Sequence, residues 1–138
     1  MSELVLKGHK VVGGSAEGEA LVTRDCISFM GSVNPNTGVI TEKGHQLEGQ
    51  NISKKILVYP TGKGSTGGSY MLYDMAQRGT GPKAIVNIRA EAVTAIGAIM
   101  GEIPMIDRLE KNPLEVLNTG DYVRIEADKG LMTVLRRR

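Results

Sequence analysis

Cysteine is nearly absent from this chain of 138 residues, which contains only Cys26. A single cysteine cannot form a disulfide within the chain or ligate a metal cluster, and such a chain is typical of the reducing cytoplasm. The two histidines, His9 and His45, lie far apart, and neither has a carboxylate or thiol nearby at metal-ligand spacing. We therefore expect a cytoplasmic protein that holds no metal ion by itself.

Aromatic residues, excess charge and long apolar runs are also scarce. Aromatics make up 4% of the chain, tryptophan is missing, and the formal net charge is only +2. A nucleic-acid-binding surface needs a basic face and stacking rings, so we expect no nucleic acid partner and interpret Arg136–Arg138 as a solvated tail. No apolar run approaches the ~20 residues of a membrane span, and the N-terminus lacks a signal peptide's apolar core, so neither a membrane nor export is expected.

The chain does contain enough apolar sequence for one globular domain over residues 1–138. Hydrophobic residues make up 41% of it and charged residues 23%, and its length leaves no room for a second independent domain. The first half alternates short apolar runs with turn residues, including the strong turn Asn34–Gly38. In this half we expect strands at residues 5–6, 11–12, 19–23, 27–29 and 39–41.

The second half alternates strands with helices. We expect strands at Ile56–Tyr59, Ala84–Asn87 and Met105–Ile106, with helices at about 69–79 and 91–100 between them. Apolar residues recur at helical spacing in the second helix, and we interpret them as facing the core: Ala92, Ala95, Ile96, Ile99 and Met100. Such alternation implies right-handed βαβ crossovers and a parallel sheet.

The C-terminal part returns to strands, at residues 121–126 and 131–135, which a hairpin turn at 128–130 joins. An antiparallel sheet folded against the parallel part would give three layers. The predicted fold class is therefore α/β, with a parallel βαβαβ core and an antiparallel sheet packed on it.

The segment Gly62–Ser69 lies between the predicted strand that ends at Tyr59 and the predicted helix. A strand, a glycine-rich turn and a helix start direct backbone N–H groups toward one point, where a hydroxyl or an anion can sit. Ser65 is the first candidate there. Two structural explanations stay open: the glycines can serve a tight turn, and Ser65, Thr66 or Ser69 can cap the helix. The lysine precedes the hydroxyl residues, so the order of a Walker loop is absent and nucleotide hydrolysis is not expected.

The predicted position of this loop agrees with a functional role. In folds with a parallel sheet, the site lies at the carboxyl ends of the strands, and residues 62–68 follow one such end. However, the loop offers a serine without an acid, metal or cofactor cluster beside it. We therefore expect another polypeptide to complete the site.

Three separated segments carry a family resemblance. They are Gly14–Val22, Gly62–Tyr70 and Ile96–Pro104, and in this order they resemble the small subunit of the aconitase X family over nearly the whole chain. The resemblance implies a swivelling β/β/α domain, in agreement with the three layers above. In aconitases the corresponding loop reads Gly-x-Gly-Ser-Ser-Arg, and its first serine takes a proton from carbon. Ser65 falls on that position, which implies that it is the catalytic base.

The resemblance also implies the surroundings of Ser65. Substrate contacts would come from the loop, namely Lys63, Gly64, Thr66, Gly67, Gly68 and Ser69. Backbone N–H groups, the helix N-terminus and Lys63 would stabilise the ionised form of Ser65, while a solvated loop cation is the alternative for Lys63. Gly67 stands where aconitases have a substrate-clamping arginine, so binding of tricarboxylates in the manner of aconitase is not expected.

An iron–sulfur cluster belongs to the large subunit in this family, where it binds the leaving hydroxyl as a Lewis acid. The resemblance therefore implies a cluster-bearing large catalytic subunit as the partner and a small hydroxy acid as the substrate. It implies no cofactor bound by this chain alone.

Among family members, the chain is similar to the free-standing small subunits of archaeal phosphomevalonate dehydratases, which act in the modified mevalonate pathway. This implies dehydration of (R)-5-phosphomevalonate to trans-anhydromevalonate 5-phosphate. Dehydration of cis-3-hydroxy-L-proline and a non-catalytic scaffold role stay open. The fold also carries phosphohistidine in the mobile domains of phosphoenolpyruvate-utilising enzymes, but Asn87–Ala92, where their histidine would stand, contains none.

Overall fold

The computed structural model describes residues 4–138, and its elements follow the predicted alternation closely. The strands are β1 (Leu4–Lys7), β2 (His9–Val12), β3 (Ser15–Val22), β4 (Ile56–Tyr59), β5 (Ala84–Asn87), β6 (Met105–Asp107), β7 (Tyr122–Glu126) and β8 (Leu131–Arg136). The helices are α1 (Gly67–Arg78), α2 (Ala92–Gly101) and α3 (Pro113–Val116), with a 3-10 turn η1 at Ala127–Lys129. None of the helices between residues 4 and 138 has the length and apolar character of a membrane span.

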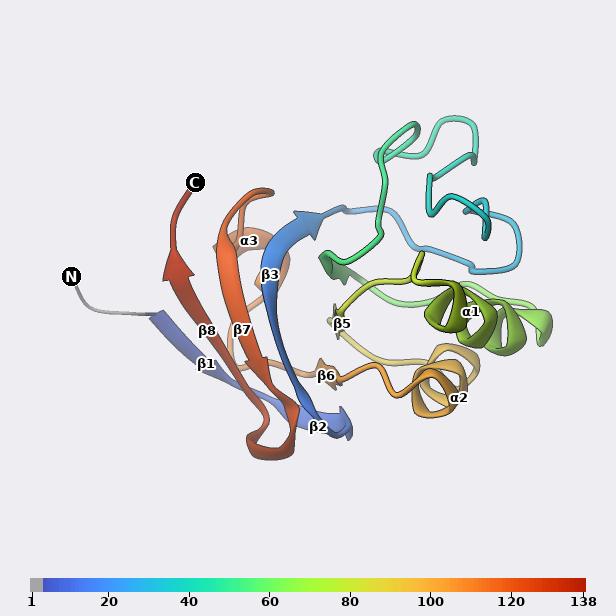
Figure 1. The fold of residues 1–138 in the computed structure, drawn as a ribbon. Helices are drawn as coiled ribbons and strands as arrows, with labels where there is room; N and C mark the ends of the chain where they lie inside the picture. The colour runs from blue at the N-terminus through green and yellow to red at the C-terminus, as the bar shows by residue number, and fades with distance from the viewer. Residues whose placement is uncertain (1–3) are drawn as a thin grey trace.

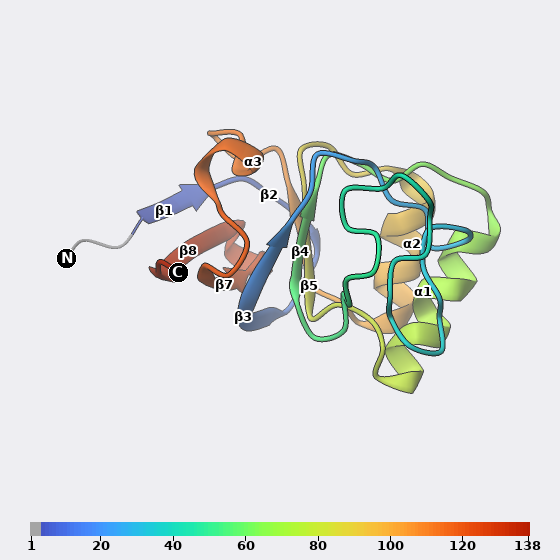
Figure 2. The ribbon, with the colours of Figure 1, turned by 90° about the horizontal axis from the view of Figure 1, so that it is seen from above.

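Strand β3 pairs with two different strands along its length. Its residues Ser15–Glu19 run antiparallel to β7, whereas Ala20–Val22 run parallel to β4. One sheet results, in the order β1-β8-β7-β3-β4-β5-β6-β2. Its antiparallel half lies over one face of the parallel half, and α1 and α2 cover the other face (Figures 1 and 2). The predicted three-layer α/β fold is confirmed, and its two β layers are halves of one bent sheet.

Each pair of neighbouring layers encloses its own apolar core. All four residues of β4 and all four of β5 are buried, because alternate side chains of these strands enter the two cores. The core on the helix side contains Leu57 and Ile85 with Leu72, Met75 and Ala98. The core between the two β layers contains Val58 and Val86 with Val123, Ile125 and Met132.

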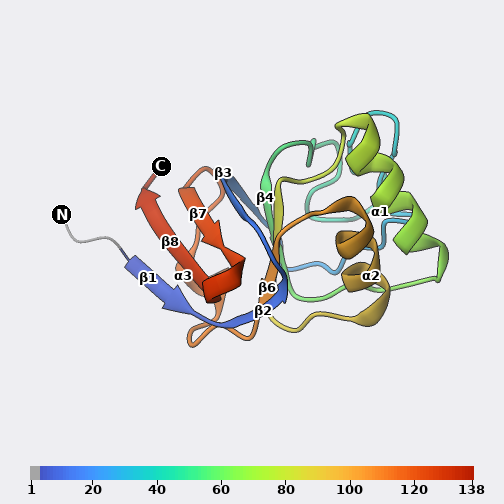
Figure 3. The same cartoon turned by 60° about the horizontal axis from the view of Figure 1, so that its bottom comes forward.

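Helices α1 and α2 lie side by side and approach each other closely (Figure 3). A Cβ atom on Gly97 would lie 2.9 Å from the carbonyl oxygen of Ser69 and 3.1 Å from Leu72 Cβ, so this position has no room for a larger residue. The Ser69 hydroxyl donates a hydrogen bond of 2.6 Å to the carbonyl oxygen of Val93. Close packing and this hydrogen bond together hold the helix pair as one unit.

The apolar residues of α2 divide between core and surface. Gly97 and Ala98 are buried against α1, whereas the side chains of Ile96 and Ile99 are 50% and 59% exposed. The interpretation of this face as the core face is therefore wrong for Ala92, Ile96 and Ile99, which are exposed, and Ala95 and Met100 are only half-buried. Helical spacing alone placed them there, but α1 covers only the face that carries the small residues.

Residues 23–55 connect β3 to β4 without a strand of their own. The strands predicted at 27–29 and 39–41 are wrong, since isolated bridges form there instead, such as Ile27 with Gly62 and Ile40 with Val33. The predicted turn is confirmed, because the Gly38 N–H donates to the Asn34 carbonyl over 2.8 Å. The segment lies beside the helices (Figure 2) and fills the core there with Ile27, Phe29, Val33, Ile40, Leu47 and Ile52.

Two further features differ from expectation. Helix α3 was not predicted, although Asn112 before Pro113 is a known helix start, and its side chain accepts a hydrogen bond of 3.0 Å from Leu114 N–H. The terminal arginines are exposed, as expected, but they are held to the antiparallel layer and do not form a free tail. Arg136 stacks on the Tyr122 ring, 4.6 Å from its centre, and Arg137 donates to Asp121 over 2.8 Å.

Replacing Gly97 with valine tests the close contact between the helices. The new side chain would meet the backbone of Ser69, so we expect the free energy of unfolding to fall by about 1–3 kcal/mol in urea denaturation. Gly18→Ala is the matched control, because its Cβ would lie 3.5 Å or more from every neighbour. A Gly97→Val variant as stable as the control would contradict this account of the helix pair.

Candidate active site

The Gly-rich loop leaves the carboxyl end of β4 at the centre of the parallel strands. On one side, Lys63 N–H donates to the Ile27 carbonyl over 3.1 Å. On the other side, the N–H groups of Ile88 and Arg89 donate to the Pro60 carbonyl over 3.0 and 3.2 Å. The loop is therefore held from both sides by the segments that follow β3 and β5.

Glu91 holds the start of helix α2 in place next to the loop. Its carboxylate caps α2 by accepting hydrogen bonds from the N–H groups of Val93 and Thr94 over 2.9 and 2.7 Å, and it also contacts the Thr94 hydroxyl. Gly62 passes so close to Glu91 and Thr94 that a Cβ atom there would overlap them. Gly62 is thus required by close approach and not by the tight turn that the sequence left open for these glycines.

Ser65 lies exposed at the start of α1. Its carbonyl accepts a hydrogen bond of 2.9 Å from Gly68 N–H, which begins the helix. Thr66 occupies the position before the helix, but its side chain makes no capping hydrogen bond. Within residues 4–138, no side chain or backbone group binds the Ser65 hydroxyl either, so the capping explanation for these two hydroxyls is wrong. The hydroxyl of Ser65 is available for chemistry at the surface.

Ser69 differs from Ser65 although both belong to the same motif. Its side chain is buried, and its hydroxyl proton is committed to the Val93 carbonyl. The hydroxyl joins α1 to α2, so the capping interpretation is wrong for Ser69 as well, whereas its contact with substrate stays a prediction. The structure therefore separates an exposed serine from a structural one within five residues of chain.

Lys63 is held by a carboxylate from the long segment. Its Nζ lies 2.7 Å from Oε2 of Glu42, while Oε1 of Glu42 accepts a hydrogen bond of 2.5 Å from the Ser32 hydroxyl. The hydrogen bond from Lys63, followed by that from Ser32, holds the pKa of Glu42 below its ordinary value. Lys63 is thus paired with Glu42 in the loop that carries Ser65, while about half of its side chain stays exposed to solvent. No sequence pattern pointed to Glu42.

A basic residue follows each of the four parallel strands. Lys63 follows β4, Arg24 follows β3, Arg89 follows β5 and Arg108 follows β6, and parallel strands end at one edge of the sheet. Lys63 pairs with Glu42, and Nε of Arg108 lies 3.8 Å from Oδ2 of Asp107. Arg24 and Arg89 are exposed and form no ion pair within the described chain. This edge therefore favours an anionic ligand.

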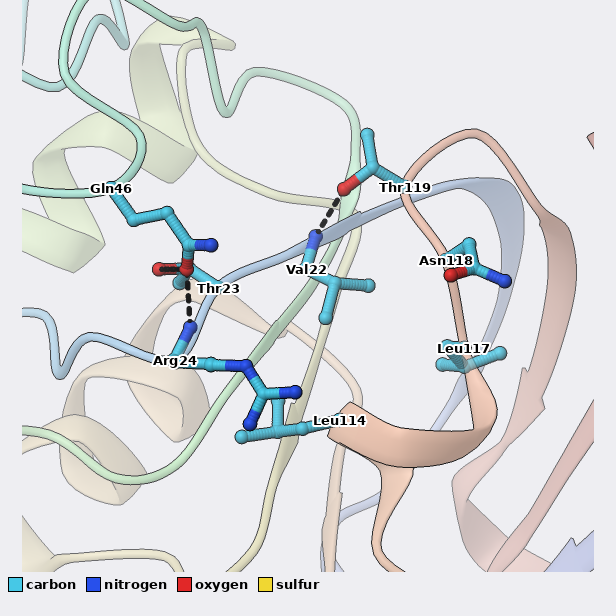
Figure 4. A pocket seen from close by; sticks show the side chains of 8 residues that line it. All are labelled: Val22, Thr23, Arg24, Gln46, Leu114, Leu117, Asn118 and Thr119. Atoms are coloured by element: carbon cyan, nitrogen blue, oxygen red, sulfur yellow. Dashed lines mark hydrogen bonds between the residues drawn. The ribbon is translucent and has the colours of Figure 1, made fainter.

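Two pockets open at this end of the molecule. The first, of about 180 Å³, is shown in Figure 4 and is lined by Val22, Thr23, Arg24, Gln46, Leu114, Leu117, Asn118 and Thr119. Its polar groups largely bind one another, for example Thr23 with Gln46 over 2.9 Å and Val22 N–H with Thr119 over 3.0 Å. The second, of about 240 Å³, borders the loop and is lined by Thr66, Ser69, Tyr70, Val93, Ile96 and Met100.

The two strand ends below the loop carry buried polar side chains. Asn87 closes β5 and donates a hydrogen bond of 3.1 Å to the Tyr59 carbonyl at the end of β4. Burial raises the pKa of the Tyr59 hydroxyl far above its ordinary value, so Tyr59 stays neutral. Both residues position the loop from beneath and do not reach its exposed face.

The donor set of the chain does not suit an iron–sulfur cluster. Such clusters need several cysteine thiolates, and Cys26 is the single cysteine here. Across residues 4–138, no three histidine, cysteine, aspartate or glutamate side chains gather as a metal site. His45 is occupied structurally, since its ring nitrogens bind the Cys26 carbonyl and the Leu47 N–H, each over 3.0 Å.

Comparisons with known proteins agree on one family. The family model of the aconitase X swivel domain matches residues 5–134. The chain is 49% identical over 127 residues to the phosphomevalonate dehydratase small subunit of Methanocella arvoryzae, covering 92% of this chain and 96% of that relative. It is 47% identical over 130 residues to the protein of the same name from Thermococcus kodakarensis, covering 94% and 96%.

The fold agrees with a solved structure as well. The holo-form crystal structure of aconitase X from Thermococcus kodakaraensis superposes with a TM-score of 0.91 at 46% identity, covering 96% of this chain and 99% of that one.

The ion pair of Lys63 predicts a pH dependence. A carboxyl whose pKa is lower in the folded than in the unfolded state stabilises the fold when the pH is above the pKa of the unfolded state. This stabilisation is lost as the pH falls through the pKa of the folded state. We therefore expect Lys63→Met to raise the pKa of Glu42 toward the ordinary glutamate value in an NMR titration of the Glu42 carboxyl. Lys43→Met removes a neighbouring charge that forms no ion pair in the described residues, and should leave this titration unchanged. An unshifted Glu42 in Lys63→Met would contradict the ion pair.

Proposed function

The chain belongs to the aconitase X family, whose swivel domain it carries, and from this premise we propose that it is the small subunit of a phosphomevalonate dehydratase. The enzyme is a hydro-lyase that converts (R)-5-phosphomevalonate to trans-anhydromevalonate 5-phosphate and water. The observation that carries the proposal is the exposed, unbound hydroxyl of Ser65 at the carboxyl edge of the parallel sheet. We align this hydroxyl with the first serine of the corresponding loop of aconitases, which takes a proton from carbon.

We assign Ser65 the role of proton acceptor. Dehydration breaks a C–H bond α to the carboxylate and the C–O bond of the neighbouring hydroxyl, and a C=C bond forms between the two carbons. Ser65 Oγ, in its ionised form, would take the proton from carbon. A neutral serine is a weak base, so its ionised form needs nearby positive charge, for which the N-terminus of α1 and the ordered Lys63 are suited. Because Glu42 already neutralises part of the Lys63 charge, we attribute the larger share to backbone N–H groups.

Substrate contacts are assigned to the exposed part of the loop. We assign contacts to the exposed Gly64 backbone and to the Thr66 hydroxyl beside Ser65, and, with the Met30 side chain displaced, to the backbone at Gly67 and Gly68, which Met30 and Val93 now cover. The phosphate and carboxylate of the substrate match the unpaired cations that follow β3 and β5. Gly67 offers no arginine to clamp a third carboxylate, so citrate and isocitrate are expected to be poor substrates.

A second polypeptide must supply the remaining chemistry. Since this chain has a single cysteine, we assign the iron–sulfur cluster to the large subunit, together with activation of the leaving hydroxyl. The names of the relatives, all small subunits, support a larger partner.

The three alternative functions have less support. The relatives are named for phosphomevalonate rather than for cis-3-hydroxy-L-proline. A phosphohistidine carrier needs an accessible histidine at the start of α2, where Glu91 forms the cap instead. A non-catalytic scaffold gives no reason for an unbound hydroxyl at this edge.

Replacing Ser65 with alanine tests the assigned base. Reconstituted with the large subunit, Ser65→Ala should lose about 10²–10⁴-fold in kcat with a smaller change in KM, because a group that acts in the transition state is removed. Folding and subunit association should survive, since the hydroxyl binds nothing within the described chain. Thr66→Ala, at the neighbouring exposed hydroxyl, is the control and should cost less than about 10-fold. Normal turnover of Ser65→Ala would favour the scaffold reading.

Replacing Arg89 with methionine tests the anionic edge. Loss of one charge-assisted contact should raise KM for 5-phosphomevalonate by about 10–100-fold, with less effect on kcat. Arg136→Met removes an arginine on the antiparallel layer, where it stacks on Tyr122, and should leave KM unchanged. Equal KM values for both variants would show that Arg89 does not contribute to substrate binding.

A further inference from the structure

The outer side of the helix pair exposes large apolar side chains. Tyr70 of α1 is 69% exposed, and Ile96 and Ile99 of α2 are 50% and 59% exposed. The sequence of α2, AVTAIGAIMG, contains no charged residue, so its exposed positions are apolar throughout. Single exposed apolar residues are ordinary, but a contiguous group of them on one face marks an interaction surface.

Two of these side chains, Tyr70 and Ile96, line a groove between the helices. The helix groove, lined by Thr66, Ser69, Tyr70, Val93, Ile96 and Met100, has a volume of about 240 Å³ and no charged residue in its lining. Its base is rigid, because Ser69 binds the Val93 carbonyl and Gly97 packs tightly on α1. A preformed apolar groove of this size suits one or two apolar side chains of a protein partner, and it does not suit the anionic substrate.

The groove is continuous with the catalytic loop. Thr66, which lines it, is the residue next to Ser65. Beyond the loop, the side chain of Met30 packs over Gly67 and is 46% exposed, so apolar surface borders the loop on this side as well. A protein that presents a substrate carbon to Ser65 would therefore come within reach of this surface.

We propose that the helix groove, with Ile99 and Met30 at its margins, is the docking surface for the large subunit. This inference rests on the proposed function, because it identifies the occupant as the chain that holds the substrate opposite Ser65. Apolar side chains of the large subunit fill the groove beside Thr66. Docking at this surface fixes the distance between Ser65 and the substrate, so assembly and formation of the active site are one event.

The test uses the full chain and the large subunit of the same dehydratase. Ile96→Asp and Ile99→Asp place a charge on the groove and its margin, and each should weaken association by about 30-fold or more, measured by analytical ultracentrifugation. Val5→Asp is the matched control, because Val5 is 47% exposed on β1 in the antiparallel layer. It should associate like wild type. Circular dichroism and thermal unfolding verify that all three variants fold.

Activity measurements separate docking from chemistry. When the concentration of the large subunit is raised, Ile96→Asp should reach a kcat near that of the wild type, at a higher concentration than the wild type needs. Ser65→Ala, in contrast, should stay slow even when the large subunit is saturating. Wild-type association of both groove variants would overturn the docking surface and leave the proposed function standing. Failure of the wild-type chain to bind the large subunit would instead overturn the proposed function. A wild-type chain that self-associates through Ile96 would overturn the assignment of the large subunit as the occupant.

Discussion

The double pairing of β3 determines where every other layer of this protein lies. Its first residues hold β7 in an antiparallel ladder, and its last three hold β4 in a parallel one. The sheet must therefore bend at β3, which lays the antiparallel half over the parallel half and leaves the opposite face to the helices. Strands β4 and β5 then lie between two apolar cores, and their loops emerge at one well-supported edge.

That edge suits the part in catalysis that we propose for this domain. The loop after β4 is bound by the segments after β3 and β5, rests on the Glu91 cap, and carries Lys63 in an ion pair with Glu42. These contacts restrain the backbone on both sides of Ser65 while its hydroxyl stays exposed. A rigid support with one free reactive group suits an active site that a second subunit completes.

The sequence predicted those parts of the structure whose signal is local. Strands β4 and β5 were placed at their observed bounds because each is an apolar run of four residues between turn signals. Residues 27–29 and 39–41 have a similar sequence pattern, but their side chains fill the core while their backbone forms only isolated bridges. Whether such an apolar run becomes a strand or a core-filling loop depends on tertiary contacts. The pairing of Lys63 with Glu42 and the different environments of Ser65 and Ser69 likewise depend on elements far apart in the chain. The same limit explains why helical periodicity placed Ile96 and Ile99 in the core.

The central claim is that Ser65 takes a proton from the substrate carbon in a site shared by two subunits. The structure of the assembled enzyme with 5-phosphomevalonate or an unreactive analogue bound tests it most directly. The account predicts Ser65 Oγ about 3–3.5 Å from the carbon α to the carboxylate, which is the distance of a reactive arrangement. A different basic side chain at that carbon, with Ser65 beyond hydrogen-bond reach, would contradict it.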